Sequence, residues 1–436
     1  MTLITCAIRN HNLAKGEETL SKHDYSDIPL TIAMVADWQY AVPVETTLKS
    51  IAFHNRNATI YIVNPDFPRE WFQRINANLA PLNLQVIDTK ISLDLLKNQH
   101  VSQIHIDVMS SARLLLPNLL SCSRVLYLDS DILVHQSLAP LFNVNLNGHL
   151  IGAVPDIFDH SIFNSGVMVM DLAGLRKYPS LVKQMLDFGT NPDLPDGDQT
   201  VLNHFFGQDY QPLADQFNLQ VGLESNWDYE WHYAHDPNIK SNYQRMEKAL
   251  GNFADAVIIH YVCPDKPWSL VSTPRYRQNW WQYYQLSWHQ IATQQLPAIQ
   301  SELAPALIYT QTDTIYHWDQ LARDLPQLDI NICAPTPVSK QAELMTRYPN
   351  VHVFPRIISY RLYQFVKTCS FYLDLNLGPK NIPLMRQLLD RGCPIYATES
   401  TVTREIQDAA NYHVFADHEI DHLIQTIQQH LASSKE

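Results

Sequence analysis

Short apolar runs alternate with helix-like segments along most of this chain, and that alternation constrains the fold more than any other feature. Strand-like runs stand at residues 28–42 (IPLTIAMVADWQYAV), 58–64 (ATIYIVN) and 84–89 (LQVIDT). Between the first two, residues 44–55 (VETTLKSIAFHN) carry their apolar side chains at helical spacing. Strands that alternate with helices are typical of a sheet with parallel strands. The sequence therefore predicts an α/β fold.

The same pattern starts again late in the chain, which predicts a second unit. From about residue 304, the runs ALIYTQT, LDINICAP and SFYLDLNL again alternate with helical segments. A length of 436 residues suits two or three domains of roughly 150 residues each. We predict a loosely held leader at 1–28, a first α/β domain at 29–285, a helical linker at 286–303 and a smaller, Rossmann-like α/β domain at 304–436.

Aromatic side chains recur at every fourth position near the end of the first unit. Within residues 275–296 they are Tyr276, Trp280, Tyr284 and Trp288. This spacing predicts one helix with an aromatic stripe. A helix on a membrane surface is one alternative, but the few positive charges favour a helix packed across a domain junction.

Charge and composition exclude several classes of partner. The formal net charge is −13, and Lys and Arg form no block, which argues against nucleic acid or an anionic membrane as the main partner. The six cysteines include no C-x-x-C pair, so neither a zinc site nor a dense disulfide framework is indicated. No apolar run reaches the length of a membrane span, and the N-terminus lacks a signal-peptide pattern. We expect a cytoplasmic protein.

Two carboxylates interrupt the apolar run at residues 125–134 (VLYLDSDILV). Burying Asp129 and Asp131 costs free energy unless a cation or a hydrogen-bond donor compensates their charge. At the end of a strand both can converge on Mg²⁺ or Mn²⁺, ions that commonly bridge to phosphates. The alternative, that Asp129 caps a helix while Asp131 is solvated, stays open from the motif alone. Haloacid-dehalogenase-type phosphatases also use this motif, but on the first strand of their domain.

Four segments together resemble glycosyltransferase family 8, which includes lipopolysaccharide galactosyl- and glucosyltransferases and glycogenin. They are residues 110–142 (SSARLLLPNLLSCSRVLYLDSDILVHQSLAPLF), 161–172 (SIFNSGVMVMDL), 196–203 (DGDQTVLN) and 258–268 (IIHYVCPDKPW). The resemblance covers about residues 29–285. It implies a GT-A fold with a mixed, mostly parallel sheet, a UDP-sugar donor, Mn²⁺ or alternatively Mg²⁺, and transfer with retention of anomeric configuration.

The resemblance also implies which residues bind the cation and the diphosphate. By position, Asp129, Asp131 and His260 match the metal ligands, and imidazole beside two carboxylates suits Mn²⁺ better than Mg²⁺. Lys266 matches the lysine that contacts the diphosphate and stabilises the leaving UDP. Ser130, between the two aspartates, is expected to contact the donor as well.

Further matches concern the nucleotide. Asp37 matches the uracil-binding aspartate, and Gln39 and Tyr40 occupy neighbouring nucleotide-contact positions, although Asp37 could equally cap a turn. Arg113 matches the arginine that contacts the donor sugar or phosphate; its alternative is an ion pair on an exposed helix. Cys263, also expected at the donor, stands where the family commonly has Gly, which puts the phosphate geometry there in doubt.

On the sugar side, Asn164 and Ser165 match contacts to the acceptor or the donor sugar. Asp198 and Gln199 match the pair that lies against the sugar, and we predict them as the catalytic residues. An amide is a poor nucleophile, which favours front-face transfer within an ion pair over a covalent intermediate. Trp38 departs from the family, where an acid is frequent, and either lines the base pocket or packs.

The second unit is similar to the C-terminal GT-B half of enzymes that glycosylate serine-rich repeat adhesins. Residues 306–357 and 370–377 carry this likeness, but Glu399 and Glu405 are too close for an E-x7-E donor motif. We therefore predict a retaining hexosyltransferase that uses a UDP-hexose and acts on a glycan or glycoprotein, such as a serine-rich repeat adhesin. The alternatives are a polysaccharide-extending transferase and a nucleotide-sugar-binding pseudoenzyme or adhesin-binding partner; a homo-oligomer is left open.

Overall fold

The structure is a computed structural model that describes most of the chain. The described residues are 28–100, 108–157, 159–222, 253–262, 266–269, 274–296, 303–337, 345–357 and 359–433. Apart from Ile28, the predicted leader lies outside them, and so does Cys263.

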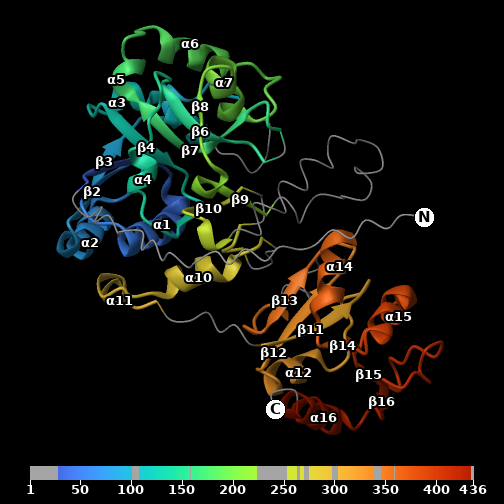
Figure 1. The fold of residues 1–436 in the computed structure, drawn as a ribbon. Coiled ribbons are helices and arrows are strands. Elements are labelled where there is room, and N and C mark those ends of the chain that lie inside the picture. The colour runs from blue at the N-terminus through green and yellow to red at the C-terminus, as the bar shows by residue number, and fades with distance from the viewer. Residues whose placement is uncertain are drawn as a thin grey trace, which may run out of the picture.

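A large mixed sheet forms the centre of the first unit (Figure 1). Its order is β3-β2-β1-β4-β7-β6-β8. Only β7 runs antiparallel to its two neighbours among these described strands, so the sheet is mostly parallel. The strands are β1 (Leu30–Val35), β2 (Ala58–Asn64), β3 (Leu84–Lys90), β4 (Arg124–Leu128), β6 (Ile151–Pro155), β7 (Phe163–Asp171) and β8 (Gln211–Pro212).

Helices cover both faces of this sheet, which is why its strands are apolar at nearly every position. Side chains alternate between the two faces of a strand. On β1, Ile32 and Met34 pack into one hydrophobic cluster, and Ala33 and Val35 into the other. The covering helices are α1 (Ala41–His54), α2 (Arg69–Leu79), α3 (Leu116–Leu119), α4 (Ala139–Phe142), α5 (Leu172–Leu175), α6 (Leu181–Phe188) and α7 (Gly197–Phe206).

A small sheet extends the first unit beside the large one. It has the order β5-β10-β9 and consists of β5 (Ile132–Val134), β9 (Leu219–Val221) and β10 (Ile258–Tyr261). β10 runs antiparallel to β5 and parallel to β9. Because β5 follows β4 after three residues, the chain passes directly from the large sheet to the small one.

The aromatic stripe does not lie on one helix. The chain forms α10 (Arg277–Gln285) and α11 (Trp288–Ala292), and Leu286 between them is extended. Ser287 and Gln290 form a capping box that starts α11 afresh, which is the physical reason for the break. Both helices contact α1, and Trp280 is fully buried there. The prediction of a single helix over 275–296 was therefore wrong.

The second sheet has the order β13-β12-β11-β14-β15-β16, and every neighbouring pair is parallel. Its strands are β11 (Ala304–Tyr309), β12 (Leu328–Cys333), β13 (Val351–Phe354), β14 (Phe371–Asp374), β15 (Ile395–Thr398) and β16 (Tyr412–Phe415). Two hydrophobic clusters lie on its two faces. The helices are α12 (Trp318–Asp324), α14 (Ser359–Thr368), α15 (Ile382–Asp390) and α16 (Ile420–Ser433). This order is the doubly wound arrangement, which confirms the Rossmann-like prediction.

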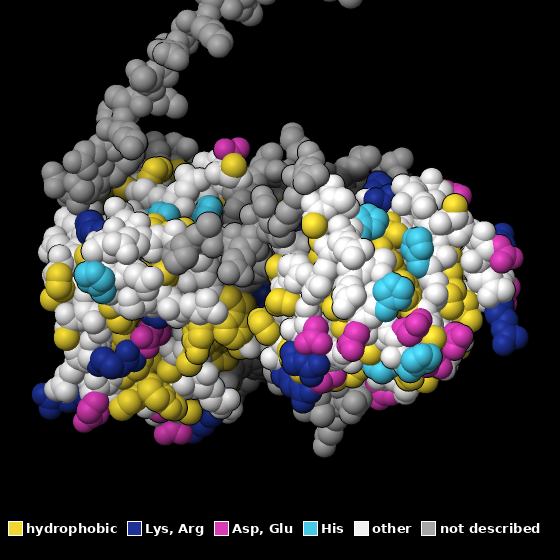
Figure 2. All heavy atoms as spheres, turned by 90° about the horizontal axis from the view of Figure 1, so that it is seen from below, with side chains coloured by type: hydrophobic (Ala, Val, Ile, Leu, Met, Phe, Trp, Pro, Cys, Tyr) yellow, Lys and Arg dark blue, Asp and Glu magenta, His cyan; other side chains and the backbone are white. Residues whose placement is uncertain are grey.

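The surface and the helix lengths bear on partners. In Figure 2, Lys and Arg side chains are scattered over the face shown and mixed with Asp and Glu. Among the described helices, none has the length and apolar character that a membrane crossing requires.

Candidate active site

Asp129 and Asp131 lie on the turn that joins the two sheets of the first unit. β4 ends at Leu128 and β5 begins at Ile132. A strand follows this turn, so the alternative in which Asp129 caps a helix is wrong. The pairing of β5 with β10 places Ile132 opposite His260. The fold thus brings His260 beside the two aspartates from a distant part of the chain.

The three predicted metal ligands point toward one another. His260 Nε2 lies 3.3 Å from Asp131 Oδ1 and 3.7 Å from Asp129 Oδ2. The other oxygen of each carboxylate contacts a basic side chain. Arg113 Nη2 lies 2.9 Å from Asp129 Oδ1, and Lys266 Nζ lies 2.6 Å from Asp131 Oδ2. Each carboxylate therefore turns one oxygen toward a basic side chain and the other toward the imidazole.

This donor set fits a divalent cation. One ligand atom from each of Asp129, Asp131 and His260 lies within 4.8 Å of the other two. Asp131 Oδ1 is buried and accepts no hydrogen bond within the described part of the chain, which is costly unless a cation binds there. Carboxylate oxygens and imidazole nitrogens are both ordinary ligands of divalent metal ions.

The electrostatic environment differs between the two aspartates. Burial opposes the charge on Asp131, but Lys266 and His260 outweigh it and hold its pKa well below the ordinary value. Burial raises the pKa of Asp129; Arg113 opposes this effect without cancelling it, and the nearby Asp131 adds to it. Asp131 is thus the firmly ionised member of the pair, and added positive charge would favour ionisation of Asp129.

Arg113 is a buried bridge, so the alternative of an exposed ion pair is wrong. Arg113 is 5% exposed, and its Nε lies 2.9 Å from Asp198 Oδ2. Its Nη1 donates to the Ser165 carbonyl at 2.8 Å, and the guanidinium lies over the Tyr127 ring. Burial lowers the pKa of Arg113, but Asp129 and Asp198 outweigh burial and raise it. Arg113 therefore ties the turn at Asp129 to the start of α7.

Gly166 on β7 forms the floor of the site. A Cβ at this position would lie 2.1 Å from His260 Cε1 and 2.7 Å from Asp129 Oδ2. The Gly166 carbonyl also accepts a hydrogen bond from the Asp129 N–H at 2.8 Å. A glycine is therefore required here because side chains of the site itself approach the backbone closely.

The predicted sugar-side residues form a buried network beside this floor. Gln199 Oε1 accepts a hydrogen bond from the Ser165 N–H at 3.1 Å. Asn164 and Ser165 are 7% and 3% exposed, so their side chains face the protein interior. Asp198 is 4% exposed, and its Oδ1 accepts from the Ser110 hydroxyl at 2.5 Å. The structure places all four near Arg113, held mainly by one another and by neighbouring protein groups.

The predicted nucleotide contacts follow β1, which lies beside β4 and parallel to it. Parallel strands end at the same edge of a sheet, so Asp37 and Asp129 share that edge. Asp37 also caps a turn, because its Oδ1 accepts from the Gln39 N–H at 3.0 Å. Gln39 is exposed and Tyr40 half-buried, and Trp38 is 45% exposed while its ring meets Phe67 edge-on.

Ser130 contributes its backbone to the turn, where its carbonyl accepts from the Thr47 hydroxyl at 3.3 Å. This contact attaches the turn at residues 129–131 to α1. Cys263 lies outside the described residues.

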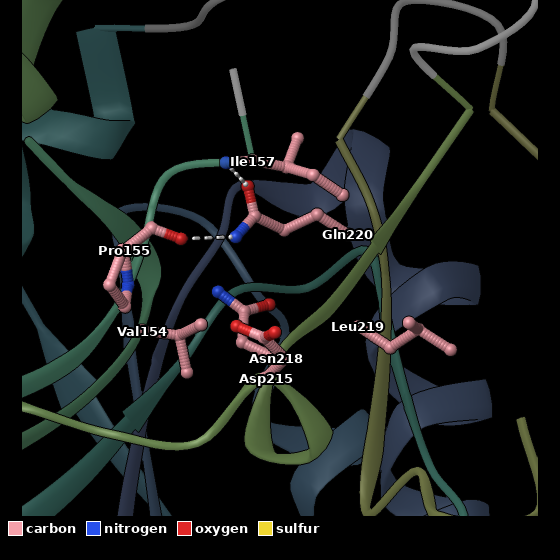
Figure 3. Close-up of a pocket in the computed structure, with 7 residues that line it drawn as sticks. All are labelled: Val154, Pro155, Ile157, Asp215, Asn218, Leu219 and Gln220. Atoms are coloured by element: carbon pink, nitrogen blue, oxygen red, sulfur yellow. Dashed lines mark hydrogen bonds between the residues drawn. The ribbon is translucent and has the colours of Figure 1, made fainter. Parts of the chain in front are cut away.

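Asn218, just before β9, is a site residue that the sequence analysis missed. Its Oδ1 lies 3.0 Å from His260 Nδ1, and it is 2% exposed. It also lines a pocket of about 10 Å³, room for a single water molecule. Figure 3 shows the opposite wall, where Gln220 bonds to the backbone of Ile157 and Pro155. No spacing or motif marks Asn218, because its role depends on two chain segments 42 residues apart.

Comparison with known proteins identifies the family of each unit. The model of Glycosyl transferase family 8 matches residues 31–271, and that of the GftB/GlyA-F C-terminal domain matches residues 306–436. Both resemblances noted in the sequence are thereby confirmed.

Individual relatives match nearly the whole chain. Glycosyltransferase GlyF of Streptococcus pneumoniae TIGR4 is 30% identical over 393 residues, which covers 88% of this chain and 94% of the relative. Glycosyltransferase GlyE of the same organism is 28% identical, covering 86% and 92%. A crystal structure of GlyE superposes with a TM-score of 0.50 at 25% identity, covering 92% of this chain and 99% of that one. The chain has a GT-A fold and belongs to glycosyltransferase family 8.

Proposed function

We propose that this chain is a metal-dependent, retaining hexosyltransferase that takes its sugar from a UDP-hexose. One observation carries the proposal: Asp129 Oδ2, Asp131 Oδ1 and His260 Nε2 face one another, while basic side chains hold the remaining carboxylate oxygens. Such a constellation binds a divalent cation, and a cation held by two carboxylates commonly bridges to a diphosphate.

The donor binds at the edge of the sheet where β1 and β4 end. A divalent cation held by Asp129, Asp131 and His260 would neutralise charge on the diphosphate and so favour departure of UDP. Lys266 adds a second positive charge beside Asp131 and contacts the leaving phosphates. Asp37, Gln39 and Tyr40, at the same edge, hold the uridine.

Transfer occurs on the face from which UDP leaves. A covalent intermediate would require a free nucleophilic oxygen, yet Gln199 is an amide whose Oε1 already accepts the Ser165 N–H. Asp198 is nearly buried and paired with Arg113, which suits an anchoring role better than attack on the sugar. Gln199 and Asp198 therefore shape the sugar site. Front-face transfer in this site retains the anomeric configuration of the sugar.

The acceptor is a glycan or a glycoprotein. The second unit supports this proposal, because its sequence matches the C-terminal domain shared by GftB and the GlyA–GlyF proteins. The sequence of the second unit lacks the E-x7-E pattern of a donor site. This favours a role in acceptor binding over a second catalytic site.

The test is release of UDP from a panel of UDP-sugars, with Mn²⁺ and with chelator. Activity with one or a few UDP-hexoses that disappears with chelator is expected. Asp131→Ala should abolish it, whereas the control Asp94→Ala, which changes an exposed aspartate on the 3₁₀ helix Leu93–Leu95, should not. Turnover that persists in chelator and in Asp131→Ala contradicts the metal site. The preferred UDP-sugar is then offered with candidate glycopeptides to identify the acceptor.

A further inference from the structure

The two nitrogens of the His260 ring have opposite tasks. Nε2 faces Asp129 Oδ2 and Asp131 Oδ1, whereas Nδ1 faces Asn218 Oδ1 at 3.0 Å. A neutral imidazole carries its proton on one nitrogen and a lone pair on the other. To ligate a cation through Nε2, the ring must keep its proton on Nδ1.

A chain of buried hydrogen bonds determines where that proton sits. It begins at the Gly166 N–H, which donates to Asn164 Oδ1 at 3.1 Å. A backbone N–H can only donate, so the Asn164 atom that it meets must be the oxygen. Asn218 approaches this same oxygen at 2.9 Å and must therefore present its NH₂ group. The other end of the Asn218 amide, its oxygen, then faces His260.

A second backbone donor supports the same orientation. The Ser165 N–H donates to Gln199 Oε1 at 3.1 Å, which identifies that atom as oxygen. Asn164 Nδ2 lies 3.4 Å from it and has the donor character that this contact needs. Reversing the Asn164 amide would place an oxygen against Gln199 Oε1 and its NH₂ against the Gly166 N–H. Two independent N–H groups thus exclude the reversed amide.

Because these side chains are buried, water cannot take the place of a partner in this hydrogen-bond chain. Asn164, Asn218 and His260 are 7%, 2% and 3% exposed. A buried polar atom without a partner is costly, so each link accepts or donates as its neighbour dictates. The Gly166 N–H therefore determines which atom of each side chain donates and which accepts, as far as the His260 ring.

We propose that Asn218 is a positioning residue for metal binding: it holds the His260 proton on Nδ1, through a hydrogen-bond relay whose direction is set by the Gly166 N–H. Gly166 serves twice, since its N–H orients the relay and its missing side chain leaves room for the His260 ring. The inference rests on the proposed function, because it assigns His260 Nε2 to the cation. Partners of this type normally orient a metal-bound histidine and raise its basicity.

The first experiment reads the tautomer directly and requires no metal. ¹⁵N spectra of histidine side chains are recorded on the metal-free protein at alkaline pH, with His260 assigned by its absence in His260→Gln. A proton on Nδ1 is expected in the parent protein. A proton on Nε2 would overturn the proposed relay, but it would not contradict the proposed glycosyltransferase activity.

The second experiment measures Mn²⁺ affinity without nucleotide, by electron paramagnetic resonance of free Mn²⁺. Asn218→Ala should weaken binding by about 10- to 100-fold. Asn218→Asp still accepts from Nδ1 but places an oxygen against Asn164 Oδ1 in place of the NH₂ group, so its affinity should lie between those of Asn218→Ala and the parent. The matched control is Gln220→Ala. Gln220 is a similarly buried amide on β9 that pairs with His260 in register, but its side chain bonds to the backbone of Pro155 and Ile157. It should also bind like the parent.

The outcomes separate the two proposals. Parent-like Mn²⁺ affinity in Asn218→Ala, or equal losses in Asn218→Ala and Gln220→Ala, overturns the positioning role alone. A parent protein that keeps the proton on Nδ1 but binds no Mn²⁺ overturns the metal site, and the proposed function with it. If Asn218→Ala does not fold, the tautomer of the parent protein still decides the question, because a proton on Nε2 overturns the relay.

Discussion

Arg113→Met should destabilise the first unit severely, because the guanidinium compensates two buried carboxylates. Arg113 lies 2.9 Å from both Asp129 Oδ1 and Asp198 Oδ2. Methionine fills similar space but leaves both acids without that cation. Removing one partner of a buried ion pair typically costs about 3–5 kcal/mol. Since a domain is stable by only about 5–15 kcal/mol, the variant should be near the limit of folding.

The assay is urea unfolding at neutral pH in chelator, followed by tryptophan fluorescence. Two rescues follow from the charge balance. Asp198→Asn in the Arg113→Met background removes one uncompensated acid and should recover stability. In a parallel series without chelator, Mn²⁺ at a hundred times its Kd should add about 2.7 kcal/mol. Arg323→Met, which removes an exposed arginine, is the control and should unfold like the parent. Parent-like unfolding of Arg113→Met, or further loss on adding Asp198→Asn, would refute the reasoning.

Three further predictions concern the floor of the site, pH and the second sheet. Gly166→Ala should abolish Mn²⁺ binding measured by calorimetry, because its Cβ would lie 2.1 Å from the ring of His260; binding unchanged from the parent would contradict that floor. Burial lowers the pKa of His54 to about 4 from 6.5, so its contribution to stability is present above pH 6.5 and lost as pH falls toward 4. Urea unfolding should therefore show a loss of about 3 kcal/mol over this range that His54→Asn reduces. Lys380→Met should lower the thermal midpoint of the second sheet and leave Mn²⁺ binding intact, because it strips the cation 2.6 Å from the fully buried Asp374.

Much of the fold was predictable because apolar periodicity reports burial directly. The runs that become β1, β2 and β4 are buried on both faces, as their continuous apolar sequence indicates. The break between α10 and α11 was also encoded, since Ser287 and Gln290 have the spacing of a capping box. The aromatic stripe concealed that signal, because four rings at regular spacing favour one helix.

The site was predictable only in part, for a different reason. Asp129, Asp131 and His260 stand in recognisable motifs, so their convergence could be expected. The bridge from Arg113 to Asp198 and the contact of Asn218 with His260 join residues that are distant in sequence and stand at no fixed spacing. Such pairs depend on how strands are placed in space, and strand placement is what the structure adds.

The most direct test of the account is a titration of the parent protein with Mn²⁺, with and without UDP. We predict one site per chain that binds Mn²⁺ more tightly when UDP is present, as expected if the cation bridges protein and diphosphate. In Asp131→Asn, binding should weaken by at least about tenfold, while Asp94→Asn should bind like the parent. No saturable binding, or equal affinity in Asp131→Asn and the parent, would contradict the central claim that Asp129, Asp131 and His260 hold a divalent cation.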